Sequence, residues 1–105
     1  MPGEYSGVTV AEKANVYFGG KVISHSVTLA DGTKKTLGVI LPGSYSFNTA
    51  APERMDITFG KTKVRFAGES GWKDYAEGSH FNVAGNSSFE IAVDEGHAEY
   101  VCSFG

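Results

Sequence analysis

The chain is divided into short runs in which apolar and polar residues alternate, and turns containing glycine or proline separate these runs. In residues 21–29, for example, Ile23, His25, Val27 and Leu29 fall on one side of an extended chain, and serine and threonine residues occupy the other side. A period of two residues is typical of β-strands with one buried face. The dominant pattern therefore predicts an all-β fold.

Runs of this kind recur at intervals of about 8–12 residues, a spacing typical of sandwiches and barrels. The runs expected to form strands are residues 16–29, 36–41, 44–49, 53–59, 63–67, 72–75, 80–83, 89–93 and 99–104. Asp31-Gly32 is a hairpin signal, because both of its turn positions need a positive φ. No stretch of about 11 residues keeps the apolar spacing of a helix without a glycine or proline interrupting it.

The domain organisation is expected to be simple. The 105 residues suffice for one domain, and no linker, repeat or low-complexity segment divides them. Fourteen glycines supply the many turns that short strands need. We expect one β-domain over residues 15–105, preceded by a tail or a loosely attached strand over residues 1–14.

Charge and cysteine content narrow the partners and the compartment. Nine Lys and Arg against twelve Asp and Glu give a net charge of −3, which argues against a generic basic surface for nucleic acid or an anionic membrane. No apolar run approaches the roughly 20 residues of a membrane span, and the N-terminus lacks signal-peptide features. The single cysteine, Cys102, excludes an intrachain disulfide framework. A cytoplasmic protein is therefore expected.

The alternation also suggests a site. Glu53 has the same parity as Met55, Ile57 and Phe59, so a carboxylate begins an otherwise apolar row. A second row, formed by Tyr45, Phe47 and Thr49, leads into the same bend. Together the rows would place aromatic rings, a hydroxyl and a carboxylate at one end of a barrel interior, a frequent place for ligand sites. The alternative is that Glu53 begins its strand in solvent and only caps the preceding turn.

Other chemically active residues give weaker signals. His25, His80 and His97 lie far apart in the sequence and lack the spacing of known metal motifs, so separate surface histidines are the simpler interpretation. Cys102 shares a strand face with Tyr100 and is expected to be a small core residue. No serine stands in a nucleophile motif or next to a base, so nucleophilic catalysis has little support.

Several blocks of sequence point to a specific family. The segments NVYFGGKVIS (15–24), PGSYSFNTAAPERM (42–55), YAEGSHFNVAGNSSFEI (75–91) and YVC (100–102) resemble the small-cupin pyrimidine/purine nucleoside phosphorylase family in order and spacing. The resemblance implies a cupin-type jelly-roll β-barrel, usually a homodimer. It also implies phosphorolysis of purine and pyrimidine nucleosides to a free base and a pentose 1-phosphate, with inorganic phosphate as co-substrate.

The same resemblance allows a comparison with metal-binding cupins. Glu53 and Gly60 keep the Glu-x₆-Gly spacing of their first motif, which favours an inward Glu53 over a solvent-facing one. Phe47 and Thr49 stand where that motif has two histidines, and Phe89 stands at the histidine position of the second motif. Because three of the four usual ligands are replaced, the resemblance implies a barrel without a metal cofactor.

Residue roles follow from the chemistry of phosphorolysis, whose transition state is expected to have oxocarbenium character. Glu53 is the candidate to stabilise the sugar, and Thr49 the candidate to assist it as a neutral donor. Arg54 or Lys21 could bind phosphate, although parity places Arg54 opposite Glu53 on the strand. The aromatic residues expected to stack on the base are Tyr45, Phe47, Phe81 and Phe89.

Two other functions fit the same residues. The first is a binding or sensing cupin that holds a nucleoside, a sugar or another small molecule without chemistry. The second is a metal-dependent cupin with unusual ligands, for example His25 and Glu53. Phosphate-dependent release of a free base would distinguish the phosphorylase from both.

Overall fold

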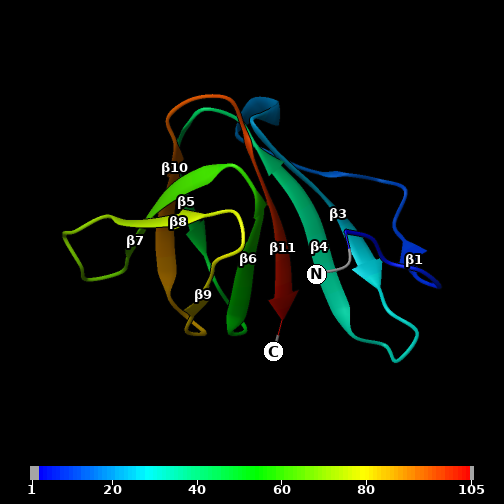
Figure 1. Cartoon of the computed structure of the whole chain (residues 1–105). Coiled ribbons are helices and arrows are strands. Elements are labelled where there is room, and N and C mark those ends of the chain that lie inside the picture. Colours follow the sequence, from blue (N-terminus) through cyan, green and yellow to red (C-terminus); the bar gives the residue numbers. More distant parts are fainter. Residues whose placement is uncertain (1–2, 105) are drawn as a thin grey trace.

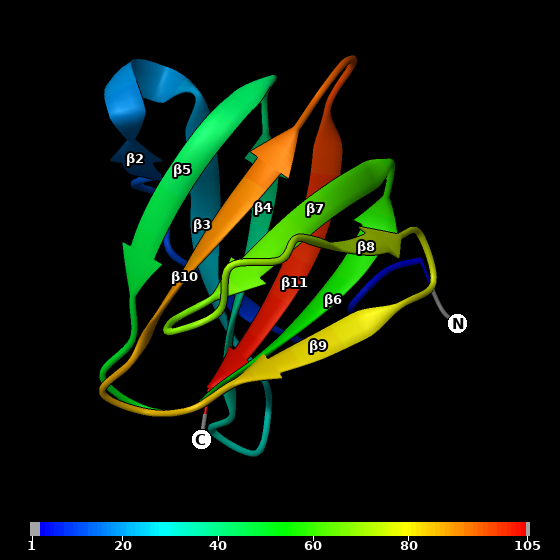
Figure 2. The same cartoon turned by 90° about the vertical axis from the view of Figure 1, so that its left-hand side faces the viewer.

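The computed structural model describes residues 3–104, which form two antiparallel sheets that face each other (Figures 1 and 2). The first sheet contains, in spatial order, β1 (Thr9–Val10), β3 (Val22–Thr28), β4 (Lys34–Ile40), β11 (Ala98–Phe104), β6 (Glu53–Phe59) and β9 (His80–Val83), and β2 (Asn15–Tyr17) also pairs with β3. The second sheet contains β5 (Gly43–Asn48), β10 (Ser88–Val93), β7 (Lys61–Phe66) and β8 (Lys73–Ala76). The prediction of a single all-β domain is confirmed.

The two sheets remain separate ladders in the part of the chain that the structure describes, and no hydrogen-bonded strand pair closes them into one barrel. The strands β9 and β8 lie along one lateral edge of the sandwich, and β3 and β5 lie along the other (Figure 2). The structure therefore consists of two facing sheets and not of the closed barrel that was expected. The edge between β3 and β5 is the one that matters for the site.

Each run expected to form a strand overlaps a strand of the structure, but the run 16–29 is interrupted. A short 3-10 helix, η1 (Phe18–Gly20), separates β2 from β3. Gly19 and Gly20 adopt φ values of 67° and 96°, and Phe18 itself has a φ of 52°. These left-handed conformations end β2 and turn the chain over the edge of the sandwich.

The space between the sheets is filled mainly by inward-facing apolar side chains. The buried cluster consists of Val22, Ile40, Tyr45, Met55, Ile57, Val64, Phe81, Val83, Phe89, Ile91, Val93, Ala98, Tyr100 and Cys102. Burying one large apolar side chain contributes roughly 1.5–3 kcal/mol. This cluster holds the sheets together and fixes the positions of the side chains that line the open edge.

The segment before residue 15 contributes one short strand. Thr9 and Val10 form β1, which pairs with the far end of β3, and the Ala11 carbonyl lies 3.2 Å from Nδ1 of His25. His25 therefore faces this N-terminal segment on the outer side of the sheet. The first two residues of the range 1–14 lie outside the described residues.

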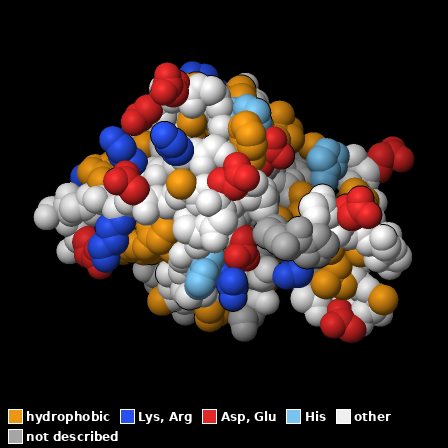
Figure 3. Space-filling view, in the orientation of Figure 1, with side chains coloured by type: hydrophobic (Ala, Val, Ile, Leu, Met, Phe, Trp, Pro, Cys, Tyr) orange, Lys and Arg blue, Asp and Glu red, His pale blue; other side chains and the backbone are white. Residues whose placement is uncertain are grey.

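The outer surface gives two further observations. No helix within residues 3–104 is long and apolar enough to cross a membrane. On the face shown in Figure 3, acidic and basic side chains are interspersed. A mixed surface of this kind differs from the concentrated basic face by which many proteins bind nucleic acids.

Candidate active site

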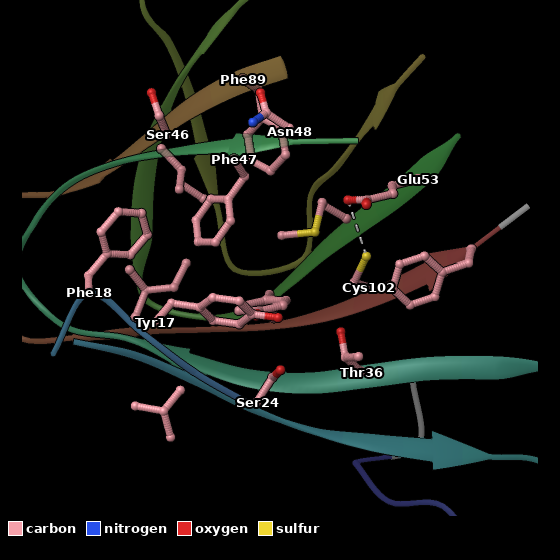
Figure 4. A pocket seen from close by; sticks show the side chains of 16 residues that line it. Tyr17, Phe18, Ser24, Thr36, Ser46, Phe47, Asn48, Glu53, Phe89 and Cys102 are labelled. Carbon is pink, nitrogen blue, oxygen red and sulfur yellow. Dashed lines mark hydrogen bonds between the residues drawn. The ribbon is translucent and has the colours of Figure 1, made fainter. Parts of the chain in front are cut away.

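A cavity of about 600 Å³ lies between the two sheets at the edge formed by β3 and β5 (Figure 4). Its lining residues are Val16, Tyr17, Phe18, Ser24, Thr36, Ile40, Ser46, Phe47, Asn48, Glu53, Met55, Phe89, Ile91, Tyr100, Cys102 and Phe104. The volume falls within the roughly 300–1,000 Å³ of small-molecule sites, which are mostly apolar with a few placed polar groups. This cavity has that character.

Aromatic rings form one wall of the cavity. Phe47 of β5 and Phe89 of β10 are register partners, and their ring centroids lie 5.8 Å apart in a stacked arrangement. Tyr17 and Phe18 cover the mouth, with ring centroids 5.7 and 5.4 Å from Phe47 and nearly perpendicular planes. The faces of flat rings are well suited to hold a flat heterocycle.

A carboxylate and a thiol lie together at the other end of the cavity. The Sγ of Cys102 is 3.5 Å from Oε1 of Glu53, as the dashed line in Figure 4 marks. Burial raises the pKa of Glu53 above its ordinary value, and the hydrogen bond from Cys102 opposes that shift. Burial, together with the nearby charge of Glu53, raises the pKa of Cys102 to about 12. The thiol therefore stays protonated, and Glu53 is the acidic group of this site.

Hydroxyl groups line the inner face of the first sheet. Ser24 and Thr36 point into the cavity in Figure 4, and Tyr100 also lines it. Burial raises the pKa of Tyr100 to about 12, so its phenol remains neutral. The side chain of Asn15, on the neighbouring β2, donates to Oγ of Ser24 over 3.2 Å. The floor of the cavity is thus polar but uncharged.

The structure brings together three of the residues singled out from the sequence. Phe47, Glu53 and Phe89 all line the cavity, although they come from β5, β6 and β10. These are three of the four positions at which metal-binding cupins keep their ligands. The predicted inward row that begins at Glu53 agrees with the burial of Met55 and Ile57, whereas Phe59 at the end of that row is exposed.

Three other predicted residues are not among those that line the cavity. Oγ1 of Thr49 donates to the Ala84 carbonyl over 2.6 Å and accepts a bond from the Ser87 backbone, so it fastens a loop. The hydroxyl of Tyr45 donates to the carbonyls of Leu41 and Pro42 within the core. Phe81 is a buried core residue that packs against Phe66, Tyr75 and Phe89.

The two predicted cations also lie outside the lining. Arg54 faces the outer side of β6, where it forms an ion pair with Asp56 over 3.2 Å. The strand begins regularly, so Arg54 and Glu53 point to opposite faces, as their parity requires. Lys21 is exposed and directly follows η1, whose Phe18 covers the cavity mouth.

The donor set of the cavity does not fit a metal centre. At the four positions that supply cupin ligands, Phe47 and Phe89 have no ligating atom, and Thr49 is bonded to the backbone of a loop. Glu53 is the one strong metal ligand among them. Within residues 3–104, no group of three or more His, Cys, Asp or Glu side chains is placed to hold a metal ion.

Several cavity residues were not identified from the sequence. They are Tyr17, Phe18, Ser24, Thr36, Tyr100 and the cavity-facing side of Cys102. Parity identified the inward face for Cys102, but it pointed the wrong way for Ser24 and Thr36, because their apolar neighbours Ile23 and Val39 lie on the outer face. Parity alone does not tell which strands become neighbours, and that pairing is what brings these side chains together.

Solved structures of other proteins share this fold. A structure of a protein of unknown function from Acinetobacter sp. ADP1 superposes with a TM-score of 0.94 at 47% identity, over 97% of this chain and 98% of that chain. Oxalate decarboxylase from Bacillus subtilis, which has Mn(II) centres, superposes with a TM-score of 0.73 over 98% of this chain and 30% of that chain. At 18% identity, the second comparison shows the fold alone.

The fold and the cavity together define a cupin-like β domain with an aromatic, acid-containing pocket between its sheets. Residues 12–104 match the family model described as pyrimidine/purine nucleoside phosphorylase. A protein of that name from Dechloromonas aromatica is 61% identical over 102 residues, which cover 97% of this chain and 98% of the relative. The chain therefore belongs to the pyrimidine/purine nucleoside phosphorylase family. It is an enzyme, and the prediction of a nucleoside phosphorylase is confirmed.

Proposed function

We propose that the chain phosphorolyses both purine and pyrimidine nucleosides in the cavity between its sheets. A phosphate oxygen forms a bond to the anomeric carbon, and the bond from that carbon to the base nitrogen breaks. The electron pair of the broken bond leaves with the base, so the products are a pentose 1-phosphate and a free base. The observation that carries this proposal is the presence of an aromatic wall and a carboxylate in one space of about 600 Å³.

Glu53 is proposed to act on the sugar. Positive charge develops on the pentose ring as the base departs, and a nearby carboxylate stabilises that charge. Glu53 lies inside the cavity, where burial raises its pKa. The hydrogen bond that Glu53 accepts from Cys102 opposes this shift and favours the charged carboxylate. A carboxylate in this position can also accept hydrogen bonds from the hydroxyl groups of the pentose.

Phenylalanine rings are proposed to hold the base. Phe47 and Phe89 form the wall that faces the polar floor, and stacking on a ring accepts every base because each base has a π-face. This accounts for a broad range of bases without a set of base-specific hydrogen bonds. Tyr45 and Phe81, also predicted to stack on the base, pack in the core instead.

Phosphate has to be bound without a cation from the cavity wall, because the lining contains no lysine or arginine. Lys21 remains the candidate for this role, since it follows η1 at the cavity mouth. Arg54 is held by Asp56 on the outer face and is not proposed as a ligand. The reaction is proposed to need no metal cofactor, because the cupin ligand positions keep only Glu53 as a strong donor.

The decisive experiment measures free base. The protein is incubated with uridine or adenosine, with and without phosphate, and the released uracil or adenine is quantified by chromatography. Phosphate-dependent release from both nucleosides is expected. Release of neither base, combined with thermal stabilisation by the nucleosides, would instead identify a binding protein.

A carboxylate variant then tests the location of the reaction. Glu53→Gln is expected to lower kcat by about 100-fold, the size of effect seen when one transition-state partner is removed. Glu95→Gln is the matched control, because Glu95 is exposed in the loop before β11. Unchanged activity of Glu53→Gln would remove the proposed role of this carboxylate.

A jelly roll of the cupin type is also proposed for the two sheets. From β4 onward, every connection crosses from one sheet to the other except the one between β7 and β8: β4, β6, β9 and β11 belong to the first sheet, and β5, β7, β8 and β10 to the second. This interleaving supports the proposal, because two Greek keys wrapped around one another produce such an order.

A homodimer and a cytoplasmic location are the remaining proposals. Ile23 and Val39 are register partners on the outer face of the first sheet, and both are exposed. Such an exposed apolar pair favours association, which sedimentation analysis can measure. Cys102 is a free, buried thiol, which favours a reducing compartment.

A further inference from the structure

A row of register partners crosses the floor of the cavity. Asn15 of β2 pairs with Ser24 of β3, Ser24 pairs with Gly38 of β4, and Gly38 pairs with Tyr100 of β11. Residues directly opposite each other in antiparallel strands point to the same face of the sheet. The side chains of this row therefore all face the interior, although they come from four different strands.

Gly38 allows the two hydroxyl groups of the row to meet. A side chain at this position would overlap the phenol ring of Tyr100, including its hydroxyl oxygen. The ring therefore lies over Gly38 and extends toward Ser24, on the far side of β4. The hydroxyl groups of Ser24 and Tyr100 therefore approach each other on the inner face of the sheet.

The direction of these hydrogen bonds follows from the chemistry of the first donor. Nδ2 of Asn15 donates to Oγ of Ser24 over 3.2 Å, so Ser24 accepts that bond and keeps its own hydrogen to donate. This hydrogen is available for the phenol oxygen of Tyr100, which lies next to Ser24 in the row. The hydroxyl hydrogen of Tyr100 is then available to a bound molecule, because Tyr100 lines the cavity. Such a chain of bonds polarises its last donor.

The separation between Tyr100 and Glu53 suits a nucleoside whose sugar and base contact different residues. Along β11, Cys102 follows Tyr100 by two residues on the same face, which is about 7 Å in a strand. Cys102 contacts Glu53 directly. A pentose beside Glu53 would thus place its base one step along β11, between the floor at Tyr100 and the wall at Phe47.

We propose that Tyr100 donates a hydrogen bond to the acceptor atom that purines and pyrimidines share next to the glycosidic bond, N3 of a purine or O2 of a pyrimidine. This inference rests on the proposed function. These two atoms occupy equivalent places beside the sugar, as the minor groove of DNA illustrates. One fixed donor therefore serves both classes of base and distinguishes neither.

The donor acts on charge that develops during the reaction. When the bond between sugar and base breaks, its electron pair moves into the base, and negative charge grows on N3 or O2. Tyr100 stabilises that charge through its hydrogen bond and keeps its own proton. The departing base takes its proton from water afterwards, so no further reactant is needed.

A variant and a substrate analogue, combined, test the contact. Tyr100→Phe removes the hydroxyl but keeps the ring over Gly38. It is expected to lower kcat/KM for uridine and adenosine by about 100-fold each. With 3-deazaadenosine, which has no N3 acceptor, the variant and the natural chain are expected to agree within about twofold. An equal loss with adenosine and 3-deazaadenosine would overturn the proposal.

Two serine variants provide a matched control for the relay. The side chain of Asn15 donates over 3.2 Å to Ser24 and also over 3.2 Å to Ser26, so either alanine variant removes one bond of the same length. Ser24 lies beside Tyr100 in the row across Gly38 and lines the cavity, whereas Ser26 pairs with Thr36 and does not line the cavity. Ser24→Ala is expected to lower kcat/KM by about 10-fold and Ser26→Ala by less than about twofold. Equal effects would contradict the relay.

Binding without phosphate separates failure of this inference from failure of the proposed function. Affinity for uridine, adenosine and 3-deazaadenosine is measured by calorimetry with the natural chain and with Tyr100→Phe. A selective loss of adenosine binding supports the contact even if no base is released, in which case phosphorolysis alone is wrong. Equal binding of all three nucleosides by the two chains, together with equal turnover, overturns the contact.

Discussion

Two groups of aromatic side chains lie at opposite edges of the space between the sheets. At the edge of β8 and β9, the ring of Phe81 lies 5.8 Å from Phe66 and 4.9 Å from Tyr75. At the edge of β3 and β5, Tyr17 and Phe18 lie 5.7 and 5.4 Å from Phe47. The ring spacings are similar, but only the second group borders the cavity.

The difference lies in what surrounds each group. Phe81 is 3% exposed, because both sheets pack against it, whereas Tyr17 and Phe18 are 43% and 47% exposed. η1 carries Phe18 over the open edge without filling the space beneath it. Phe89 touches both groups, at 5.7 Å from Phe81 and 5.8 Å from Phe47. Aromatic residues are thus packed in the core at one edge and line an open cavity at the other.

The largest expected effect is on stability at the closed edge. Phe81→Ala should lower the free energy of unfolding by about 3–5 kcal/mol, because it leaves a cavity among packed rings. Urea denaturation measures this loss. Phe47→Ala is the matched substitution at the open edge, where the ring is only half-buried, and it should cost less. Equal losses from the two substitutions would show that the two edges are packed equally tightly, contrary to this comparison.

The next effect is on function at the open edge. Phe47→Ala should lower kcat/KM by about 10-fold for uridine and adenosine alike, because loss of one stacking face costs roughly 1–3 kcal/mol whatever the base. Steady-state kinetics with both nucleosides checks this. A loss confined to one class of base would show that Phe47 makes a more selective contact than stacking.

The smallest expected effect is a change in Tm that depends on the charge of Glu53, which lines the cavity at the open edge. Burial raises the pKa of Glu53 in the folded protein above its ordinary value of 4.5. The folded protein therefore holds this proton more tightly than the unfolded chain does, and the carboxylate opposes folding above that pKa. Glu53→Gln should raise Tm at about pH 7, and the gain should shrink as the pH falls toward about 4.

Calorimetry across this pH range measures the difference between the two chains. A gain in Tm that does not change with pH would mean that the charge of Glu53 is not its cause. A gain in stability together with a loss of activity is expected of a residue kept for its chemistry rather than for its packing.

The fold was largely predictable from the sequence because its signals are local. Alternation within residues 53–59 and 80–83 gave β6 and β9 with their observed bounds. The break of the run 16–29 at η1 was missed, because the left-handed conformation of Phe18 depends on packing against Phe47 and Tyr45 across the sandwich.

The residues of the cavity could be predicted only where they occupy positions of a sequence motif. The spacing between Glu53 and Gly60 indicated an inward carboxylate, and the cupin positions indicated Phe47 and Phe89. Phe81 was assigned to the same group because its residue type fits equally well. Its distance from the cavity depends on the pairing of β9 with β6 at the closed edge, which no local pattern encodes.

The single cysteine has a practical consequence. Thiol reagents react with the thiolate, and Cys102 is both buried and held protonated by a pKa of about 12. Alkylation in the native state should therefore be slow, and a molecule that fills the cavity should slow it further, because Cys102 lines that cavity. Because no second thiol competes, the labelling rate of the whole chain reports how accessible the interior of the cavity is. Slower labelling in the presence of a nucleoside would thus measure its binding without any chromophore.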